Sequence, residues 1–181
     1  MRRTLMLLLT GILFVSLGCD KEEDILPIIQ SEFYIQGKVD GELIYTDYIG
    51  PGNIDIYRIS DPTYFSFERK ISRENHIIWD VSVSDLNLDN AELPITIRNY
   101  GGIGEPSVQF YFSNDNGDEG INYGVDNIDP DRFDFTITSW SDDIITGAFS
   151  GELISGSNPD KFITVTDGSF RIKLTRFDFS I

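Results

Sequence analysis

The chain contains very little cysteine, histidine or positive charge. Of its 181 residues, one is cysteine and one is histidine, and 30 Asp and Glu outnumber 14 Lys and Arg, giving a net charge of −16. A single cysteine excludes an intrachain disulfide, and His76 alone provides too few ligands for a zinc site of the usual kind. The shortage of basic residues argues against nucleic acid as a partner, because phosphates are bound by lysine and arginine.

Long apolar runs are also absent, apart from one near the start of the chain. Residues 5–15 are almost wholly apolar and follow Arg2 and Arg3. At roughly a dozen residues the run is shorter than the ~20 that span a bilayer, and it has the length of a signal-peptide core. The small residues of 16–18 then lead to Cys19. We therefore predict a signal peptide at 1–18 and lipid modification of Cys19. The alternative is an ordinary signal peptide beside a chance cysteine.

The residues after the cysteine are charged and have no periodicity, which predicts a flexible tether at 19–31. Lys21, Glu22 and Glu23 resemble the export signal of surface lipoproteins in Bacteroidetes-type bacteria, and residues 16–19 resemble a relaxed form of their lipobox. The resemblance implies a lipid-anchored protein on the outer membrane, exposed at the cell surface. A tether that merely happens to be charged is the alternative.

Residues 32–181 alternate short apolar–polar stretches with clusters of Gly, Asn, Asp and Pro. Ile77, Trp79 and Val81 would share the inward face of one strand, and Asp40-Gly41 is a strong hairpin signal. No stretch shows a convincing amphipathic helix. The pattern predicts a single all-β domain, an antiparallel sandwich or barrel of about ten strands, with no substantial helix apart from the signal segment.

The last predicted strand, from residue 170 to 181, changes the parity of its apolar residues. Phe170 and Leu174 occupy even positions, whereas Phe177 occupies an odd one, so a bulge or bend is expected near Thr175-Arg176. The same segment is unusually basic. Its Lys and Arg side chains are expected to form ion pairs with acids on a neighbouring strand, and an anion-binding strip is the alternative.

A family resemblance appears in the C-terminal part of the chain. Residues 144–153 (IITGAFSGEL) and 163–174 (ITVTDGSFRIKL), together with the first hairpin at 37–41, resemble uncharacterised Bacteroidetes lipoproteins. The resemblance covers about a third of the chain and consists of strand and turn residues. It implies a secreted β-domain of unknown function and supplies no catalytic residues.

Two loops carry oxygen ligands at alternate positions, as Ca²⁺ sites do. The candidate ligands are Asp85, Asn87 and Asp89 in one loop and Asn114, Asn116 and Asp118 in the other. Neither loop has the bidentate glutamate of a complete calcium loop, and Asn and Asp are also common in ordinary turns. Calcium is the only cofactor for which the sequence gives any indication.

Two aromatic residues are candidates for ligand contact. By strand parity Trp140 should point outward, next to Asp142 and Asp143 in the following turn, and Tyr111 lies among polar residues of another strand. Exposed rings beside acids and amides are suited to stacking on sugars. The alternative for Trp140 is a strand-end aromatic packed beneath a loop.

These observations favour a non-enzymatic, lipid-anchored binding domain for glycan or peptide, accessory to uptake or adhesion. A structural or assembly component acting by strand addition is the first alternative. A glycoside hydrolase using a pair of carboxylates is the second, because 30 acids make close pairs inevitable without identifying one.

Overall fold

The computed structural model describes residues 31–178 except 61, 99–103, 115–120 and 126–128. The predicted signal peptide, Cys19, the export signal and nearly all of the tether lie outside the described residues. The described part contains twelve strands and a single 3₁₀ turn, Pro130–Arg132. None of its helical structure is long and apolar enough to cross a membrane. The prediction of an all-β fold is confirmed.

The strands are β1 (Tyr34–Val39), β2 (Glu42–Thr46), β3 (Ile56–Arg58), β4 (Tyr64–Lys70), β5 (Ile77–Ser84), β6 (Ile95–Ile97), β7 (Ser107–Asn114), β8 (Ile121–Gly124), β9 (Phe133–Ser141), β10 (Ile144–Ser155), β11 (Asn158–Lys173) and β12 (Thr175–Phe177). Hydrogen bonds join them in the order β12-β3-β4-β5-β7-β8-β10-β11-β1-β2, and β9 pairs with β10 and β6.

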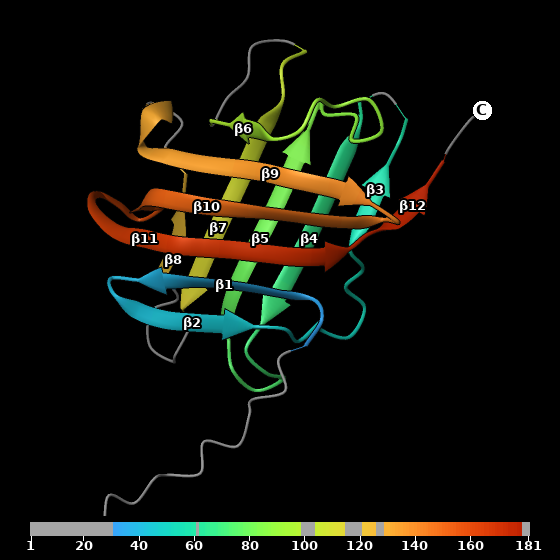
Figure 1. Cartoon of the computed structure of the whole chain (residues 1–181). Coiled ribbons are helices and arrows are strands. Elements are labelled where there is room, and N and C mark those ends of the chain that lie inside the picture. The colour runs from blue at the N-terminus through green and yellow to red at the C-terminus, as the bar shows by residue number, and fades with distance from the viewer. Residues whose placement is uncertain (1–30, 61, 99–103, 115–120, 126–128, 179–181) are drawn as a thin grey trace, which may run out of the picture.

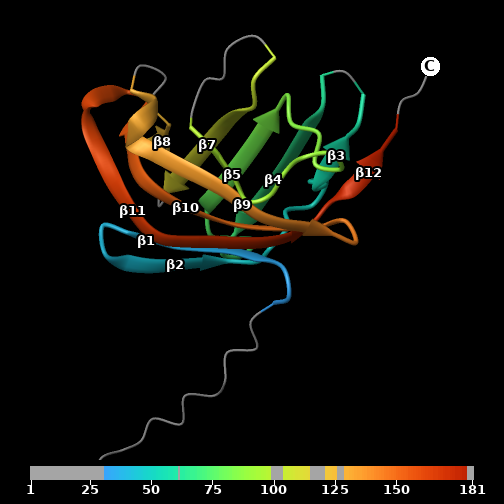
Figure 2. The ribbon, with the colours of Figure 1, turned by 45° about the horizontal axis from the view of Figure 1, so that its top comes forward.

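This sheet folds over on itself into two layers. Strands β9, β10, β11, β1 and β2 lie in front of β3, β4, β5 and β7 and cross them (Figure 1). Figure 2 shows the same two layers from a tilted view. β8 joins the layers at one corner, because it pairs with β7 and with the end of β10. The architecture is therefore sandwich-like, with the core between the layers.

Strict alternation on the strands produces an aromatic core. All the apolar residues predicted to face inward from β5 are buried, and Trp79 is completely so. The Trp79 ring lies 4.5 to 5.6 Å, centroid to centroid, from the rings of Phe110, Phe112 and Phe149. Burying a side chain of this size contributes roughly 1.5–3 kcal/mol. The two layers are thus held together largely by rings from β5, β7 and β10.

β11 is one long strand, although the apolar–polar alternation of the sequence predicts separate strands at 162–166 and 170–181. Its register shifts between Phe149, which pairs with Gly168, and Gly151, which pairs with Val165. Asp167 has a positive φ of 52° at this point. The extra residue lets Val165 and Phe170 both face the core although their parity differs. Gly168 is required here, because a Cβ would lie 2.3 Å from the Phe149 carbonyl oxygen.

The predicted break near Thr175 is confirmed, but it is a change of layer. β11 ends at Lys173 in one layer, and β12 pairs in parallel with β3 in the other. The Leu174 amide donates to the Asp143 carbonyl at 2.8 Å, and the Thr175 amide donates to the Asp55 carbonyl at 2.8 Å. The change of apolar parity therefore marks the point where the chain leaves one sheet layer for the other.

Candidate functional site

The outer face of the layer formed by β4, β5 and β7 carries a row of functional side chains. Strand pairing places Glu68, Asp80 and Tyr111 directly opposite one another on three adjacent strands. Directly opposite residues on one face have Cβ atoms about 4.5–5.5 Å apart. Two carboxyl groups and a phenol ring therefore stand side by side. We call these three residues the acid–tyrosine row.

A hollow of about 460 Å³ lies beside the row, over β3, β4 and β5. The loop at residues 52–54 forms one wall, and Glu68 and Asp80 are among the lining residues. The Asn53 side-chain amide donates to Glu68 Oε1 at 2.6 Å, so the loop is tied to the row. On the floor, the Tyr64 and Ser82 hydroxyls lie 3.2 Å apart. The hollow is therefore polar and rich in hydroxyl and carboxyl groups.

Asp80 has an unusual environment for a surface carboxylate. Partial burial raises its pKa above the ordinary aspartate value, and the neighbouring Glu68 raises it further. Glu68 is balanced by Lys70, whose Nζ lies 3.4 Å from Glu68 Oε1. Asp80 has no hydrogen bond or ion pair with another described residue. It is therefore an acceptor that a ligand hydroxyl could satisfy at a site already partly withdrawn from water.

Tyr111 provides a supported, exposed ring at the other end of the row. Gly124 on β8 pairs with it and lies directly beneath the ring, so that a Cβ at Gly124 would come within 2.9 Å of Tyr111 Cε1. The side chain is nevertheless 45% exposed. Gln109, two residues earlier on the same face, is also exposed. The ring is thus fixed from below and open above.

The structure corrects the predicted orientation of Trp140. β9 and β10 shift register between Thr146, which pairs with Ser139, and Gly147, which pairs with Ile137. Thr138 is the extra residue, and it reverses the parity of the remaining residues of β9. Trp140 consequently pairs with the fully buried Ile145 and packs against the core. Trp140 therefore does not point outward, as its predicted role as a ligand platform required.

Trp140 belongs instead to a cluster centred on Arg176 of β12. The indole Nε1 donates to Asp89 at 3.0 Å, and the ring meets Tyr57 edge-on with centroids 5.4 Å apart. The Arg176 guanidinium carbon lies 5.3 Å from the Trp140 ring centroid. Arg176 also pairs with Asp143 and, through both terminal nitrogens, with Asp89. The alternative interpretation of Trp140, a strand-end aromatic packed beneath a loop, describes this geometry.

Arg171 and Arg176 near the C-terminus pair with acids, but these acids lie in loops and turns and not on a neighbouring strand as predicted. Arg176 bonds to Asp143 in the β9–β10 turn, and Arg171 Nη2 lies 3.3 Å from Glu32 Oε1. Asp142 and Asp143 both have positive φ, 53° and 62°, and form a two-residue hairpin turn. The Asp89 carboxyl has a lowered pKa because it accepts hydrogen bonds from Arg176. These acids thus have roles in holding the C-terminal strand.

The first predicted calcium loop uses its oxygens within the protein. Asn87 Oδ1 accepts from the Tyr57 hydroxyl at 3.1 Å and from the Asp89 amide at 3.0 Å. Both Asp89 oxygens accept from Arg176, while Asp85 is exposed with a φ of 59°. In the second loop Asn114 is described, and Asn116 and Asp118 lie outside the described residues. No cluster of three or more His, Cys, Asp or Glu suited to a metal occurs among the residues described.

No model of a known protein family matches the chain. The searches of curated proteins and of solved structures also found no match. The likeness to Bacteroidetes-type lipoproteins therefore rests on the quoted motifs alone and remains a prediction.

Proposed function

We propose that this protein is a lipid-anchored cell-surface domain that binds glycan through the acid–tyrosine row. The observation that carries the proposal is the exposed Tyr111 ring, held over Gly124 and in line with Asp80 and Glu68. A pyranose ring has an apolar face that packs on an aromatic ring and hydroxyls that donate to carboxylates. The row offers both kinds of contact within the span of three strands.

The chemistry of the face favours some glycans over others. The net charge of −16 and the Glu68–Asp80 pair would repel an acidic polysaccharide. The Asp80 carboxyl has no hydrogen-bond donor among the described residues, so hydroxyl or amino donors of a ligand could supply one. We therefore expect a neutral sugar chain or an amino sugar as the ligand.

Anchoring is the second part of the proposal and rests on Cys19 at the end of the signal-like segment. Cys19→Ala should abolish membrane fractionation and fatty-acid labelling. Replacing Lys21, Glu22 and Glu23 by Ala should leave the protein lipidated but protect it from protease added to whole cells. A Cys19→Ala protein that still fractionates with the membrane would contradict the anchor, and unchanged protease access in the triple variant would contradict the export role.

The binding test is a glycan array and affinity electrophoresis with the full chain in mild detergent. Tyr111→Ala should weaken binding several-fold to about tenfold, because aromatic stacking contacts contribute about 0.5–1.5 kcal/mol. The control is Phe162→Ala, which removes another exposed ring, 53% exposed, from β11 in the other layer. Both variants should keep the wild-type melting temperature. Equal glycan binding by the two variants would contradict the assignment.

The same experiment addresses the hydrolase alternative. Glu68 and Asp80 are a pair of adjacent carboxyls, which glycoside hydrolysis requires, and they line the hollow. If the wild type releases reducing sugar from a bound glycan and Asp80→Asn does not, the protein is a glycoside hydrolase and not only a binding domain. An intact glycan recovered after prolonged incubation would support binding alone.

A further inference from the structure

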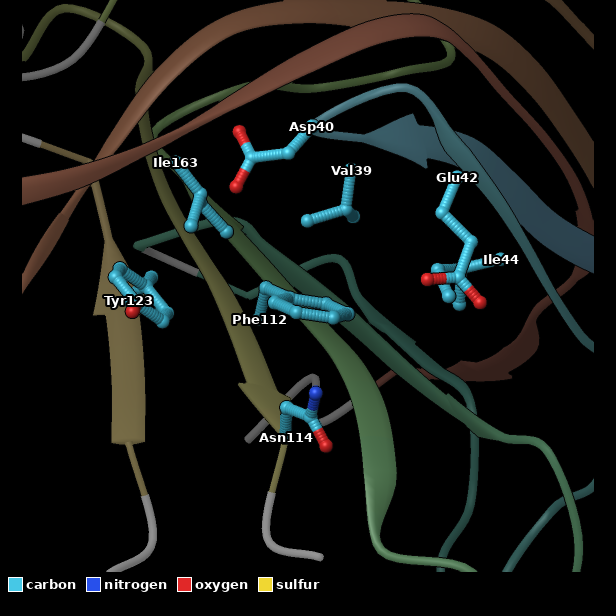
Figure 3. A pocket seen from close by; sticks show the side chains of 8 residues that line it. All are labelled: Val39, Asp40, Glu42, Ile44, Phe112, Asn114, Tyr123 and Ile163. Carbon is cyan, nitrogen blue, oxygen red and sulfur yellow. The ribbon is translucent and has the colours of Figure 1, made fainter.

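A second cavity lies between the two layers, on the opposite face of β7 from the acid–tyrosine row. It has a volume of about 330 Å³ and opens between the β1–β2 hairpin and the ends of β7 and β8. Phe112, Tyr123 and Ile163 line its walls, and Asp40, Glu42 and Asn114 add polar groups (Figure 3). Phe112 and Tyr123 are paired neighbours on β7 and β8, one residue away from the outward pair Tyr111 and Gly124. The two sites therefore share strands but not surfaces.

Of the two carboxylates at this cavity, that of Asp40 is held in place by Thr164 of β11, and that of Glu42 is exposed. Asp40 has a φ of 48°, and its amide donates to the Thr164 carbonyl at 2.9 Å. Asp40 Oδ1 accepts from the Thr164 amide at 2.8 Å, which fixes the side chain and leaves Oδ2 available. Figure 3 shows the Asp40 and Glu42 carboxylates on the hairpin side and the Phe112 ring across from them. The cavity thus combines two negative groups with an aromatic wall.

Positive charge is lacking where these carboxylates lie. Among the described residues that line the cavity there is no lysine or arginine. Lys38, the cation of the hairpin, pairs with Asp167 at 2.8 Å. A cation from outside would therefore meet two carboxylates, which attract it, beside two aromatic side chains.

We propose that this cavity binds an alkylammonium group. The aliphatic stem would pack against Phe112, Tyr123 and Ile163, and the ammonium would lie between Asp40 and Glu42. The volume is at the lower end of the range for small-molecule sites, which suits one short chain. The group could belong to a free amine or to a lysine side chain of a polypeptide, since the two present the same chemistry.

The test uses n-hexylammonium, with hexan-1-ol as the uncharged analogue, added to the full chain in mild detergent. Binding is measured by saturation-transfer NMR and calorimetry, and empty micelles give the blank. The variant Asp40→Asn/Glu42→Gln removes both charges and keeps the shape, since asparagine tolerates the positive φ at residue 40. The control Asp142→Asn/Glu92→Gln makes the same chemical changes in the β9–β10 turn and at an exposed acid elsewhere.

Hexylammonium should bind the wild type more tightly than hexanol. The cavity variant should weaken hexylammonium binding about tenfold or more, because the charge-assisted hydrogen bonds to both carboxylates are lost. Hexanol binding should persist in that variant, which also shows that the cavity is still folded. The control variant should bind hexylammonium like the wild type.

Two results would overturn the proposal. One is equal affinity of the wild type for hexanol and hexylammonium. The other is an equal loss of hexylammonium binding in the cavity and control variants, which would indicate a general effect of net charge. Nα-acetyl-lysine-N-methylamide distinguishes the sources: binding comparable to hexylammonium indicates a polypeptide side chain, and weaker binding indicates a free amine.

Discussion

A buried ion pair in the core gives the sharpest prediction about stability. Arg69 faces inward from β4 and is 1% exposed, and Asp55, just before β3, is 7% exposed. The guanidinium Nη1 and Nη2 donate to Asp55 Oδ1 and Oδ2, both at 2.7 Å. Nη1 also donates to the Glu68 carbonyl at 2.7 Å, whereas Nε has no hydrogen-bond partner among the described residues. The arginine charge is therefore neutralised almost entirely by one carboxylate.

Asp55→Asn should remove most of that neutralisation while keeping the size of the side chain. Breaking one side of a buried pair costs about 3–5 kcal/mol, because the remaining charge is left uncompensated. Domains have a total stability of roughly 5–15 kcal/mol, so the loss would be a large fraction of it. Arg69→Met should lower the stability by a similar amount, because it leaves the buried Asp55 carboxylate without its counter-charge. The double variant Asp55→Asn/Arg69→Met removes both charges and should recover much of the loss.

The assay is urea unfolding of the four proteins, followed by tryptophan fluorescence, since Trp79 is completely buried and reports on the core. A double-mutant cycle should show strong coupling, with the double variant far more stable than the summed single losses predict. The reasoning would be refuted if Asp55→Asn lost less than about 1 kcal/mol, or if the two single losses were additive. Either result would mean that water or another group compensates Arg69.

Two further predictions concern Trp140 and Asp80. Trp140→Ala should lower the free energy of unfolding by about 3 kcal/mol, as packed aromatic truncations do, with a clear drop in melting temperature; an unchanged melting temperature with lost glycan binding would restore the ligand-platform interpretation. Asp80→Asn should raise the free energy of unfolding at pH 7. The raised pKa of Asp80 means that the folded state favours its protonated form, so its contribution to stability is full below the ordinary pKa of 3.8. That contribution is lost as the pH rises through the pKa of the folded state, and the neutral asparagine avoids this loss. Urea titrations from pH 3 to 8, with Asp142→Asn as control, should show this gain shrinking toward acid pH, and a pH-independent gain would contradict it.

The strands were predictable because their signal is local. Alternation alone identified the buried face of β5, and the positive φ values of Asp40 and Gly41 fit the predicted hairpin turn. Pairing of the basic C-terminal residues with acids was also predicted, but the acids paired with Arg171 and Arg176 lie in a loop and a turn and not on a neighbouring strand. The sequence also indicates that Arg69 is buried. It has the same parity as Phe65 and Phe67 on β4, which places it in the core.

Bulges account for the principal error. One extra residue at Thr138 turns Trp140 from the solvent face to the core face, and another at Asp167 joins two predicted strands into β11. A bulge reverses every later side chain, yet it is defined by the partner strand and not by the bulged residues themselves. The two consecutive polar residues Thr138 and Ser139 were the available local hint. Both residues are also compatible with a regular strand, so regular alternation was predicted as far as Trp140.

The candidate sites depend on long-range pairing and were less accessible. Glu68, Asp80 and Tyr111 come from three strands, and only the register of β4, β5 and β7 places them in one row. The cavity beside Phe112 requires the two layers to close over each other, since Asp40 and Glu42 come from the β1–β2 hairpin. Sequence reasoning found Tyr111 as an outward aromatic but had no means of selecting one pair among 30 acids.

Adjacent residues of β4 show how differently the fold treats charge on its two faces. Arg69 points inward and is matched by Asp55, whereas Glu68 points outward and stands beside Asp80, a like charge. The inward pair is compensated within the domain, but the outward pair leaves Asp80 partly buried with a raised pKa. Binding sites often retain such unfavourable arrangements, because the ligand supplies the missing partner. If Asp80→Asn stabilises the protein and abolishes glycan binding, the same carboxylate both lowers the stability of the fold and binds the glycan. If Asp80→Asn stabilises the protein and leaves glycan binding intact, the acid–tyrosine row is not the binding site.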